Sequence, residues 1–205
     1  MSIRTNYERW YAEEGYYWGT EPGRSLDELI GLCPPAPGKR ALDIGCGEGK
    51  DAVYMAQKGY TVSAFDLTEN GIRKTLALAA DRGVTVDAWV DDINTFETKD
   101  MFDIVWSTGT VQYLFEENKA EFFRKLGRIT APDGIVFINV FVDKPFLPLP
   151  PDWDIEEKMW RPGELFTYLP DWKVERIDEV IFEDRSGGIP HHHCMDTIIC
   201  RKVAY

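Results

Sequence analysis

The sequence of 205 residues predicts an α/β protein whose sheet is doubly wound and mostly parallel. Short apolar runs alternate with stretches of helical periodicity, as they do in βαβ units. A glycine-rich turn joins the first apolar run to the first of these helices. Near the C-terminus two apolar runs flank a Gly-Gly pair, which predicts a closing antiparallel hairpin. The expected strands are 40–44, 60–65, 84–90, 102–106, 135–142, 172–183 and 193–203.

Composition indicates one domain covering residues 1–205, with enough apolar content for a sizeable core. The start of the chain is polar and aromatic, unlike a signal peptide, and no apolar run is long enough to span a bilayer. The four cysteines form no Cys-x-x-Cys pattern, which favours free thiols. A net charge of −12 excludes a nucleic-acid partner, because phosphate binding depends on Lys and Arg. We therefore expect a cytoplasmic protein with no membrane or nucleic-acid contact. The sequence leaves its oligomeric state open.

Residues 1–24 form an N-terminal arm that is unusually rich in aromatic side chains. Two interpretations are open: the rings pack on the core, or the arm is a lid that closes over a bound ligand. Its aromatic residues are Tyr7, Trp10, Tyr11, Tyr16, Tyr17 and Trp18.

The glycine turn follows the strand at 40–44. Gly45, Gly47 and Gly49 stand at alternate positions before a helix that begins near Lys50. Glycine permits positive φ and close approach of a ligand, and the first N–H groups of a helix are donors. A dinucleotide-binding turn needs Gly-x-Gly-x-x-Gly, which would require glycine in place of Lys50. This spacing counts against a nicotinamide-dependent dehydrogenase.

Asp66 ends the second strand, where a carboxylate can accept hydrogen bonds from ribose hydroxyls. The alternative is that Asp66 caps the helix that follows. The third strand leads to Asp91, Asp92 and Ile93, and the fourth to Ser107 and Thr108. Small polar residues at the carboxyl ends of strands either line a ligand crevice or satisfy loop backbone.

The stretches Leu42-Asp-Ile-Gly-Cys-Gly-Glu-Gly49 and Val90-Asp-Asp-Ile-Asn94, together with Asp66, resemble class I S-adenosylmethionine (SAM) methyltransferases. The resemblance implies a Rossmann-like sheet of seven strands in the order 3-2-1-4-5-7-6, with SAM as cofactor. It places the methionine and ribose of SAM at the glycine turn and Asp66, and the adenine at Asp92 and Ile93, with Asp91 as the alternative acid. Ser107 and Thr108 would face the methionine part. The implied cofactor residues are Trp18, Asp43, Gly45, Gly47, Gly49, Asp66, Leu67, Asp92, Ile93, Ser107 and Thr108.

Residues 143–163 carry five prolines together with Phe146, Trp153 and Trp160. Proline at this density prevents regular structure, and a long aromatic loop in a compact domain is usually functional. This segment leaves the carboxyl end of the fifth strand. We therefore expect a substrate loop that roofs the pocket.

Three consecutive histidines stand at the start of the last strand. Alternation places His191 and His193 on one face and His192 on the other. His191 and His193 are the candidate catalytic residues, as a base or an orienting group near the transferred methyl. Hydrogen-bonded structural histidines are the alternative. Spacing suggests no additional ligand, so no metal site is predicted.

The nearest likeness is to the tellurite-resistance and thiopurine methyltransferase-like group of small-molecule enzymes. It implies in-line methyl transfer from SAM to a small-molecule acceptor, with a thiol or a chalcogen oxyanion as the expected nucleophile. The alternative from another class is a SAM-binding sensor or partner subunit without catalysis.

Overall fold

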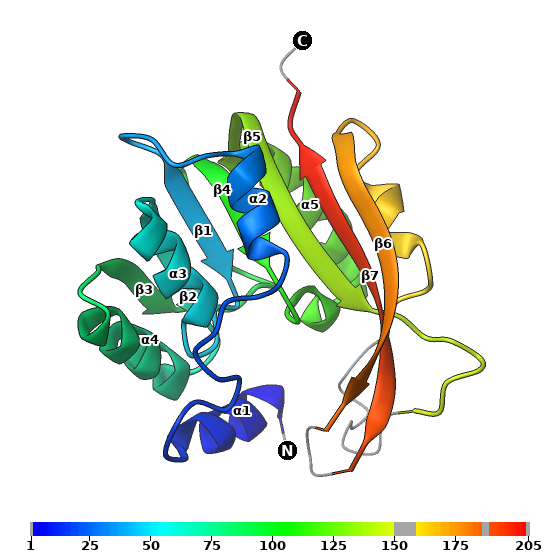
Figure 1. Ribbon diagram of the computed structural model, residues 1–205. Coiled ribbons are helices and arrows are strands. Elements are labelled where there is room, and N and C mark those ends of the chain that lie inside the picture. Colours follow the sequence, from blue (N-terminus) through cyan, green and yellow to red (C-terminus); the bar gives the residue numbers. More distant parts are fainter. Residues whose placement is uncertain (1, 150–158, 186–188, 204–205) are drawn as a thin grey trace.

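The computed structural model describes residues 2–149, 159–185 and 189–203. Its strands form one sheet in the order β3-β2-β1-β4-β5-β7-β6, which confirms the expected order (Figure 1). The first five strands pair in parallel, and β7 runs antiparallel to both β5 and β6. The strands are β1 Arg40–Ile44, β2 Thr61–Asp66, β3 Val86–Val90, β4 Phe102–Ser107, β5 Thr130–Phe141, β6 Lys173–Asp184 and β7 His191–Arg201.

Helices cover both faces of the sheet, so the strands of its centre are buried. The α-helices are α1 Ile3–Ala12, α2 Leu26–Leu32, α3 Lys50–Lys58, α4 Glu69–Asp81 and α5 Glu116–Ile129, with 3-10 turns η1 Val111–Tyr113 and η2 Glu164–Tyr168. Leu29, Met55 and Leu78, from α2, α3 and α4, belong to one apolar core. Phe122 and Leu126 of α5 belong to the other. Because the side chains of a strand alternate, Ala41 of β1 enters the first core and Leu42 the second.

The carboxyl ends of the parallel strands meet at one edge of the sheet. In Figure 1 this is the lower edge, and α1 lies below it. Ligands of open α/β sheets bind outside this edge. The fold therefore brings the glycine turn, Asp66 and the ends of β3 and β4 to a common place.

The hairpin of β6 and β7 contributes a second set of side chains. In its antiparallel register Asp184 lies opposite His191, and Phe182 lies opposite His193. Directly opposed residues share a face of the sheet, so Asp184 and the two histidines lie on one side. The predicted turn at Gly187-Gly188 lies outside the described residues.

Two elements differ from the sequence prediction. The fifth strand was expected over 135–142, after Pro132-Asp133-Gly134, but β5 already begins at Thr130. The sharp backbone is accommodated inside the strand, where Asp133 has a φ of 61°. This conformation is held by the end of the chain, because Asp133 N–H donates to the Lys202 carbonyl and Lys202 N–H donates to the Gly134 carbonyl, both at 2.9 Å.

The second difference is at the N-terminus, where the arm contains a ten-residue helix, α1, that was not predicted. Ser2 caps it by accepting a hydrogen bond from the N–H of Thr5 at 3.3 Å. In the part of the chain that the structure describes, none of the helices has the length and apolar character that crossing a bilayer requires.

Candidate active site

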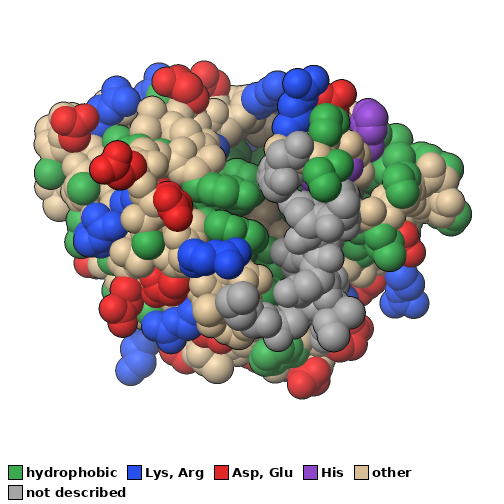
Figure 2. Space-filling view, turned by 90° about the horizontal axis from the view of Figure 1, so that it is seen from below, with side chains coloured by type: hydrophobic (Ala, Val, Ile, Leu, Met, Phe, Trp, Pro, Cys, Tyr) green, Lys and Arg blue, Asp and Glu red, His purple; other side chains and the backbone are tan. Residues whose placement is uncertain are grey.

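A cavity of about 950 Å³ opens at the carboxyl edge of the parallel strands. Its wall combines the glycine turn, the ends of β2, β3 and β4, the aromatic arm and the inner face of the β6–β7 hairpin. Seen from below the sheet, the molecule is hollowed near its centre, with hydrophobic side chains at the edge of the hollow (Figure 2). Pockets for small molecules and cofactors have volumes up to about 1,000 Å³. The cavity is therefore large enough for a cofactor and a small second ligand.

The glycine turn requires its glycines. Gly45 has a φ of 75°, and a Cβ there would lie 2.0 Å from Thr110 Oγ1. Gly49 has a φ of 88°, and a Cβ there would lie 2.6 Å from the Thr75 side chain. Gly45 and Gly47 line the cavity, whereas Gly49 packs behind the turn as the N-cap of α3 and is not part of the wall. Thus two of the three glycines face a ligand and the third maintains the bend.

Asp66 fixes the turn to the end of β2. Its Oδ2 accepts a hydrogen bond from Gly47 N–H at 2.9 Å, and its Oδ1 accepts from Thr68 N–H at 2.9 Å and Thr68 Oγ1 at 2.6 Å. Burial raises the pKa of Asp66, and these hydrogen bonds oppose the rise. Thr68, not Asp66, caps α4, because its Oγ1 accepts from Gly71 N–H. The carboxylate lines the cavity, and its Oδ2, which accepts a single hydrogen bond, retains acceptor capacity.

Asp43 is a buried carboxylate on the cavity wall, only 2% exposed. Its Oδ2 has no hydrogen-bond partner among the described residues. Burial, and then the neighbouring Asp51, raise the pKa of Asp43 well above its usual value. An unsatisfied buried acceptor of this kind is costly in the free protein. A cationic or donor group in the cavity would therefore be stabilised beside it.

The loop after β3 contributes Asp91, Asp92 and Ile93 to the wall. The two oxygens of Asp91 accept hydrogen bonds from Trp89 Nε1 at 3.1 Å and from Asp92 N–H at 2.8 Å. Asp92 uses Oδ1 to accept from the backbone and side chain of Asn94. Ile93 is buried beside them, and Leu67 lines the cavity from the end of β2. The arrangement provides a carboxylate next to an apolar surface, as an adenine would require.

Ser107 and Thr108 have different positions. Thr108 lines the cavity, and its Oγ1 accepts from Asn139 Nδ2 at 2.9 Å. Ser107 is fully buried, donates to the Ile44 carbonyl at 3.0 Å, and is absent from the wall. Of the two residues predicted to face the methionine part, the structure thus places Thr108 on the cavity wall and Ser107 behind it. Alternation along β4 turns its side chain inward to satisfy the backbone of β1.

The aromatic arm forms one side of the cavity with Tyr7, Trp10, Tyr11, Tyr17 and Trp18. Tyr7 Oη lies 2.9 Å from Tyr113 Oη of η1. Trp18 is 45% exposed, and its Nε1 donates to Tyr11 Oη at 2.9 Å.

Polar contacts attach the arm to α4 and the glycine turn. The Glu8 carboxylate accepts hydrogen bonds from the N–H groups of Glu69 and Asn70, at 2.7 and 3.1 Å, at the N-terminus of α4. Lys74 Nζ donates to the Glu13 and Gly15 carbonyls and to Glu48 Oε1.

His193 lines the cavity from β7 and is 3% exposed. Its ring centroid lies 4.7 Å from that of Phe141 and 5.7 Å from that of Phe182. His191 is also buried but stands behind His193, outside the cavity wall. Their Nε2 atoms are 2.9 Å apart. Of the two predicted catalytic residues, His193 is therefore the one that a ligand in the cavity can contact.

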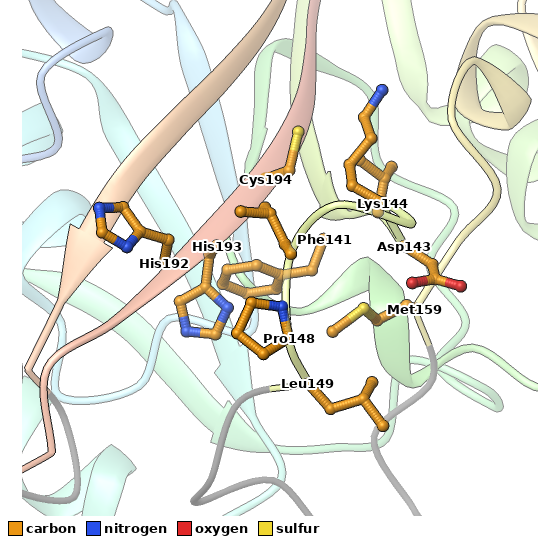
Figure 3. A pocket seen from close by; sticks show the side chains of 11 residues that line it. Phe141, Asp143, Lys144, Pro148, Leu149, Met159, His192, His193 and Cys194 are labelled. Carbon is orange, nitrogen blue, oxygen red and sulfur yellow. The ribbon is translucent and has the colours of Figure 1, made fainter.

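The proline segment is only partly described. Asp143, Lys144, Leu147, Pro148, Leu149 and Met159 border a separate cavity of about 10 Å³, together with Phe141 and Cys194 (Figure 3). These residues of the segment do not line the large cavity. Trp160 is buried, with Lys119 Nζ 3.9 Å from its ring centroid. Thus Trp160 packs in the core, whereas Phe146 and Leu149 are exposed, and Pro150, Pro151 and Trp153 lie outside the described residues.

Comparisons with known proteins agree with this geometry. A family model described as a methyltransferase domain matches residues 41–134. The probable S-adenosyl-L-methionine-dependent methyltransferase TehB of Haemophilus influenzae is 25% identical over 155 residues, which are 73% of this chain and 52% of that protein. Residues 41–134 therefore form a methyltransferase domain of the class I SAM-dependent type. The chain spans about half the length of this curated relative.

Solved structures show the same methyltransferase fold. The crystal structure of TehB from Haemophilus influenzae has a TM-score of 0.79 at 21% identity, covering 96% of this chain and 67% of that chain. The 1,6-didemethyltoxoflavin-N1-methyltransferase of Burkholderia thailandensis, with bound 1,6-didemethyltoxoflavin and S-adenosylhomocysteine, has a TM-score of 0.66 at 19% identity. It covers 88% of this chain and 77% of that chain. SAM is the cofactor of this family.

The wall of this methyltransferase domain fits SAM chemically. SAM carries a sulfonium and an ammonium group, and the wall is predominantly acidic, which favours a cation. Its carboxylates are Asp43, Asp51, Asp66, Asp91, Asp92 and Asp184, against the cations of Arg4 and Lys50. The partnerless oxygen of Asp43 adds a specific acceptor for a donor such as the ammonium.

The wall residues that sequence reasoning missed include Tyr113, Asn139 and Asp184. Asn139 holds the end of β4, because its Oδ1 accepts from Gly109 N–H at 2.8 Å and its Nδ2 donates to Thr108. Asp184 lies opposite His191 in the hairpin. Counting outward from the Gly-Gly pair would have identified that pairing, had the strands been extended by one residue in β6 and two in β7.

Proposed function

We propose that this domain transfers the methyl group of SAM to a small molecule bound in the same cavity. The single observation that carries the proposal is the continuity of the cavity wall. The wall runs from the glycine turn and Asp66 to the hairpin face of His193 and Met195. A cofactor at one end and an acceptor at the other would share one enclosed space, as direct transfer requires.

The cofactor would be held by residues from four elements. Asp66 would accept hydrogen bonds from the ribose hydroxyls, and Gly45 and Gly47 would allow the backbone to approach the methionine part. Asp43 and Thr108 face the same region of the wall. Asp92, whose Oδ2 forms no hydrogen bond among the described residues, would read the adenine amino group beside Ile93 and Leu67. Gly49 would act through the bend of the turn, and Trp18 through the arm.

SAM supplies a methyl group on a sulfonium, which is already an activated leaving group. The chain would therefore contribute mainly alignment and exclusion of water. The acceptor end of the wall has Phe141, Phe182 and Met195 around His193, with Asp184 beside it. The proposed acceptor is a thiol or a chalcogen oxyanion, which needs no strong base. For a hydroxyl or amine acceptor His193 would be the base, oriented by His191.

The aromatic arm would serve as the lid. The positive charge of the sulfonium and the negative charge of an anionic acceptor are both lost as the methyl group is transferred. This transfer is favoured when water is excluded from the cavity. Tyr7, Trp10 and Trp18 cover the cavity from the side, and the Tyr7–Tyr113 contact crosses from the arm to η1. Residues 143–163 are proposed to act as the substrate loop on the acceptor side.

The test has two stages. Calorimetry with S-adenosylhomocysteine should show binding, and Asp66→Ala should weaken it. Protein supplied with methyl-labelled SAM should then label a member of a panel of thiols, selenite, carboxylates and amines, and Asp66→Ala should lose that transfer. Tight binding without transfer to any acceptor would instead indicate a sensor or partner subunit. Binding of NADH with no binding of S-adenosylhomocysteine would refute the cofactor assignment.

A further inference from the structure

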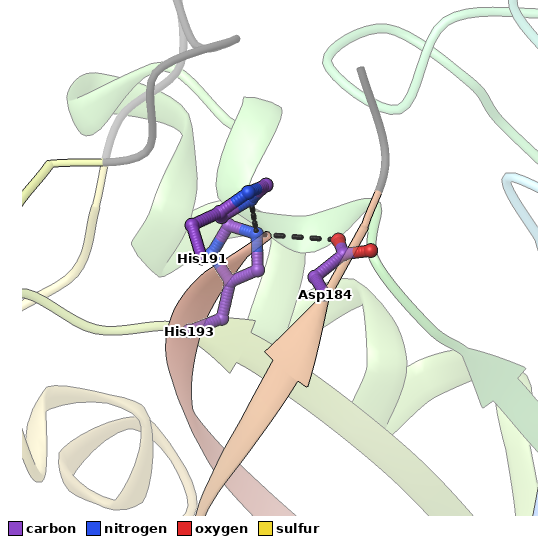
Figure 4. Close-up of side chains that lie close together, drawn as sticks. All are labelled: Asp184, His191 and His193. Carbon is purple, nitrogen blue, oxygen red and sulfur yellow. Dashed lines mark hydrogen bonds and ion pairs between the residues drawn. The ribbon is translucent and has the colours of Figure 1, made fainter. Parts of the chain in front are cut away.

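We propose that Asp184, His191 and His193 bind a divalent transition-metal ion, of the zinc class, in the wall of the cavity. One potential ligand atom from each residue lies within 4.8 Å of the other two. The side chains converge from β6 and β7, as Figure 4 shows. Two imidazoles and one carboxylate are a donor set that zinc and similar ions prefer.

The spacing of the ligand atoms fits a common ion. His191 Nε2 lies 2.9 Å from His193 Nε2, and His193 Nε2 lies 3.3 Å from Asp184 Oδ2. Atoms bound at about 2.0–2.1 Å to one zinc ion are separated by about 2.9–3.4 Å for bond angles of about 90–110°. Small side-chain adjustments would thus suffice to seat the ion.

The outer contact of His191 has the form usual for a metal ligand. Its Nδ1 lies 2.7 Å from the carbonyl oxygen of Ile189. A carbonyl can only accept, so Nδ1 carries the proton and donates it. Neutral His191 then presents the lone pair of Nε2 toward His193 and Asp184. Histidines that bind metal typically donate their other ring N–H to a carbonyl or carboxylate in this way.

A cation also explains the convergence better than a single proton does. The Nε2 of His193 faces both the lone pair of His191 Nε2 and the carboxylate of Asp184. One N–H cannot point at both acceptors, whereas a divalent ion is attracted to all three groups. Both histidines are buried, and the three residues stand on paired strands in fixed register. The site is therefore largely preformed.

The ion would lie where the acceptor binds, and a role in acceptor binding therefore rests on the proposed function. Three protein ligands leave coordination positions open, as in catalytic zinc sites. Asp184 and His193 line the cavity, so the open positions face the space where the acceptor would lie. An anionic acceptor, such as a thiolate or an oxyanion, would coordinate there. With both Nε2 atoms bound to metal, His193 would hold the acceptor and would not act as a base.

The chain provides a matched control in His192. It has the same side chain and lies between the two proposed ligands, but it is exposed and on the other face of β7. In Figure 3 the rings of His192 and His193 point in different directions. A variant His192→Ala therefore removes one histidine of the run without touching the proposed site.

The experiment uses the full chain without a purification tag, stripped with a chelator. Titration with Zn²⁺ and with Co²⁺, followed by calorimetry and visible absorption, should show one tight equivalent. His191→Ala and Asp184→Asn should weaken binding at least tenfold, and His192→Ala should leave it unchanged. Addition of a small thiol or selenite should change the Co²⁺ spectrum of the wild type.

S-adenosylhomocysteine binding, measured on each variant, reports folding and tests the cofactor assignment separately. Failure of the wild type to bind one equivalent of metal would overturn the metal site, even with cofactor binding intact. Equal losses for His192→Ala and His191→Ala would also overturn it, since binding would then belong to the histidine run. If Asp184→Asn does not fold, His193→Gln provides the second ligand variant.

Discussion

The two ends of the cavity are constructed in different ways. At the cofactor end the polar groups belong to the backbone of one turn and to carboxylates at the ends of consecutive strands. Asp66 accepts a hydrogen bond from Gly47 N–H at 2.9 Å, so the carboxylate that would contact the ligand also stabilises the turn. At the hairpin end the polar groups come from two paired strands, with His191 opposite Asp184.

The difference shows which parts of a site can be predicted from a local sequence motif and which cannot. A turn that requires positive φ constrains neighbouring residues, and its spacing can be read directly. A site formed by strand pairing depends on register, which a single run of letters does not contain. Substitutions that remove a ligand contact should therefore lower affinity, and substitutions that remove a contact of the fold should lower stability.

The largest effect is expected at Gly45. In Gly45→Ala the positive φ and the overlap with Thr110 should lower the free energy of unfolding by about 2–4 kcal/mol. Gly49→Ala has a similar positive φ and a close contact with Thr75, so a comparable loss of stability is expected. Gly49 does not line the cavity. Calorimetry with S-adenosylhomocysteine, below both melting transitions, should show severe loss of affinity for Gly45→Ala and a smaller loss for Gly49→Ala, which affects the cofactor only through the bend of the turn.

Asp66→Ala is next in size. Loss of charged hydrogen bonds worth about 1.5–3 kcal/mol should weaken S-adenosylhomocysteine binding roughly 10–100-fold. Asp66→Asn, which retains one acceptor, should lose less. Equal affinity of Asp66→Ala and wild type would show that the carboxylate serves the turn alone.

Asp43→Asn should have opposite effects on binding and stability. Burial raises the pKa of Asp43 above its ordinary 3.8, so the resulting stability is complete below pH 3.8 and is lost as pH rises through the raised pKa. Because an asparagine side chain does not ionise, the Asp43→Asn variant does not lose this stability as pH rises. Urea unfolding should therefore show Asp43→Asn gaining stability at pH 7 relative to wild type, with the gain shrinking toward pH 4.

In the same variant, affinity for S-adenosylhomocysteine should fall about tenfold, as expected for loss of a charged hydrogen bond. A variant that is destabilised at pH 7 would show that the Asp43 carboxylate is stabilised in the free protein.

The smallest effects distinguish two adjacent residues. Ser107→Ala removes the bond to the Ile44 carbonyl and should cost about 1 kcal/mol of stability with unchanged affinity. Thr108→Val should lower affinity about two- to tenfold, since it removes a hydrogen bond at the cavity wall. Chemical unfolding and calorimetry on the two variants provide the comparison. Reduced affinity for Ser107→Ala would contradict its position behind the wall.

Much of the fold could be predicted from the sequence, because alternation of apolar runs and the glycine turn are local signals. The order of strands followed from the resemblance and is confirmed. The ends of elements were less accessible. At Pro132-Asp133-Gly134 the letters indicate a turn, yet pairing of that stretch with Lys202 keeps it in β5.

On the cavity wall, Asp43, Gly45 and Asp66 could be predicted because each stands at a fixed offset from a strand end. Asp184 was missed because its relation to His191 exists only once the hairpin register is known. The sequence alone does not distinguish Ser107 from Thr108, because both are small hydroxyl residues at the end of the same strand. Which of them faces the cavity depends on the side of β4 that the helices cover.

The attachment of the arm by Glu8 has an energetic consequence. The carboxylate occupies the N–H groups of Glu69 and Asn70 at the start of α4, directly after the segment Asp66 to Thr68 that would grip the sugar of the cofactor. Lifting the arm would thus leave the positive end of that helix exposed to water. If Asp66 holds the nucleoside, its release and the detachment of the arm would both act on this one helix terminus, so a tightly held nucleoside would make residues 1–24 harder to displace.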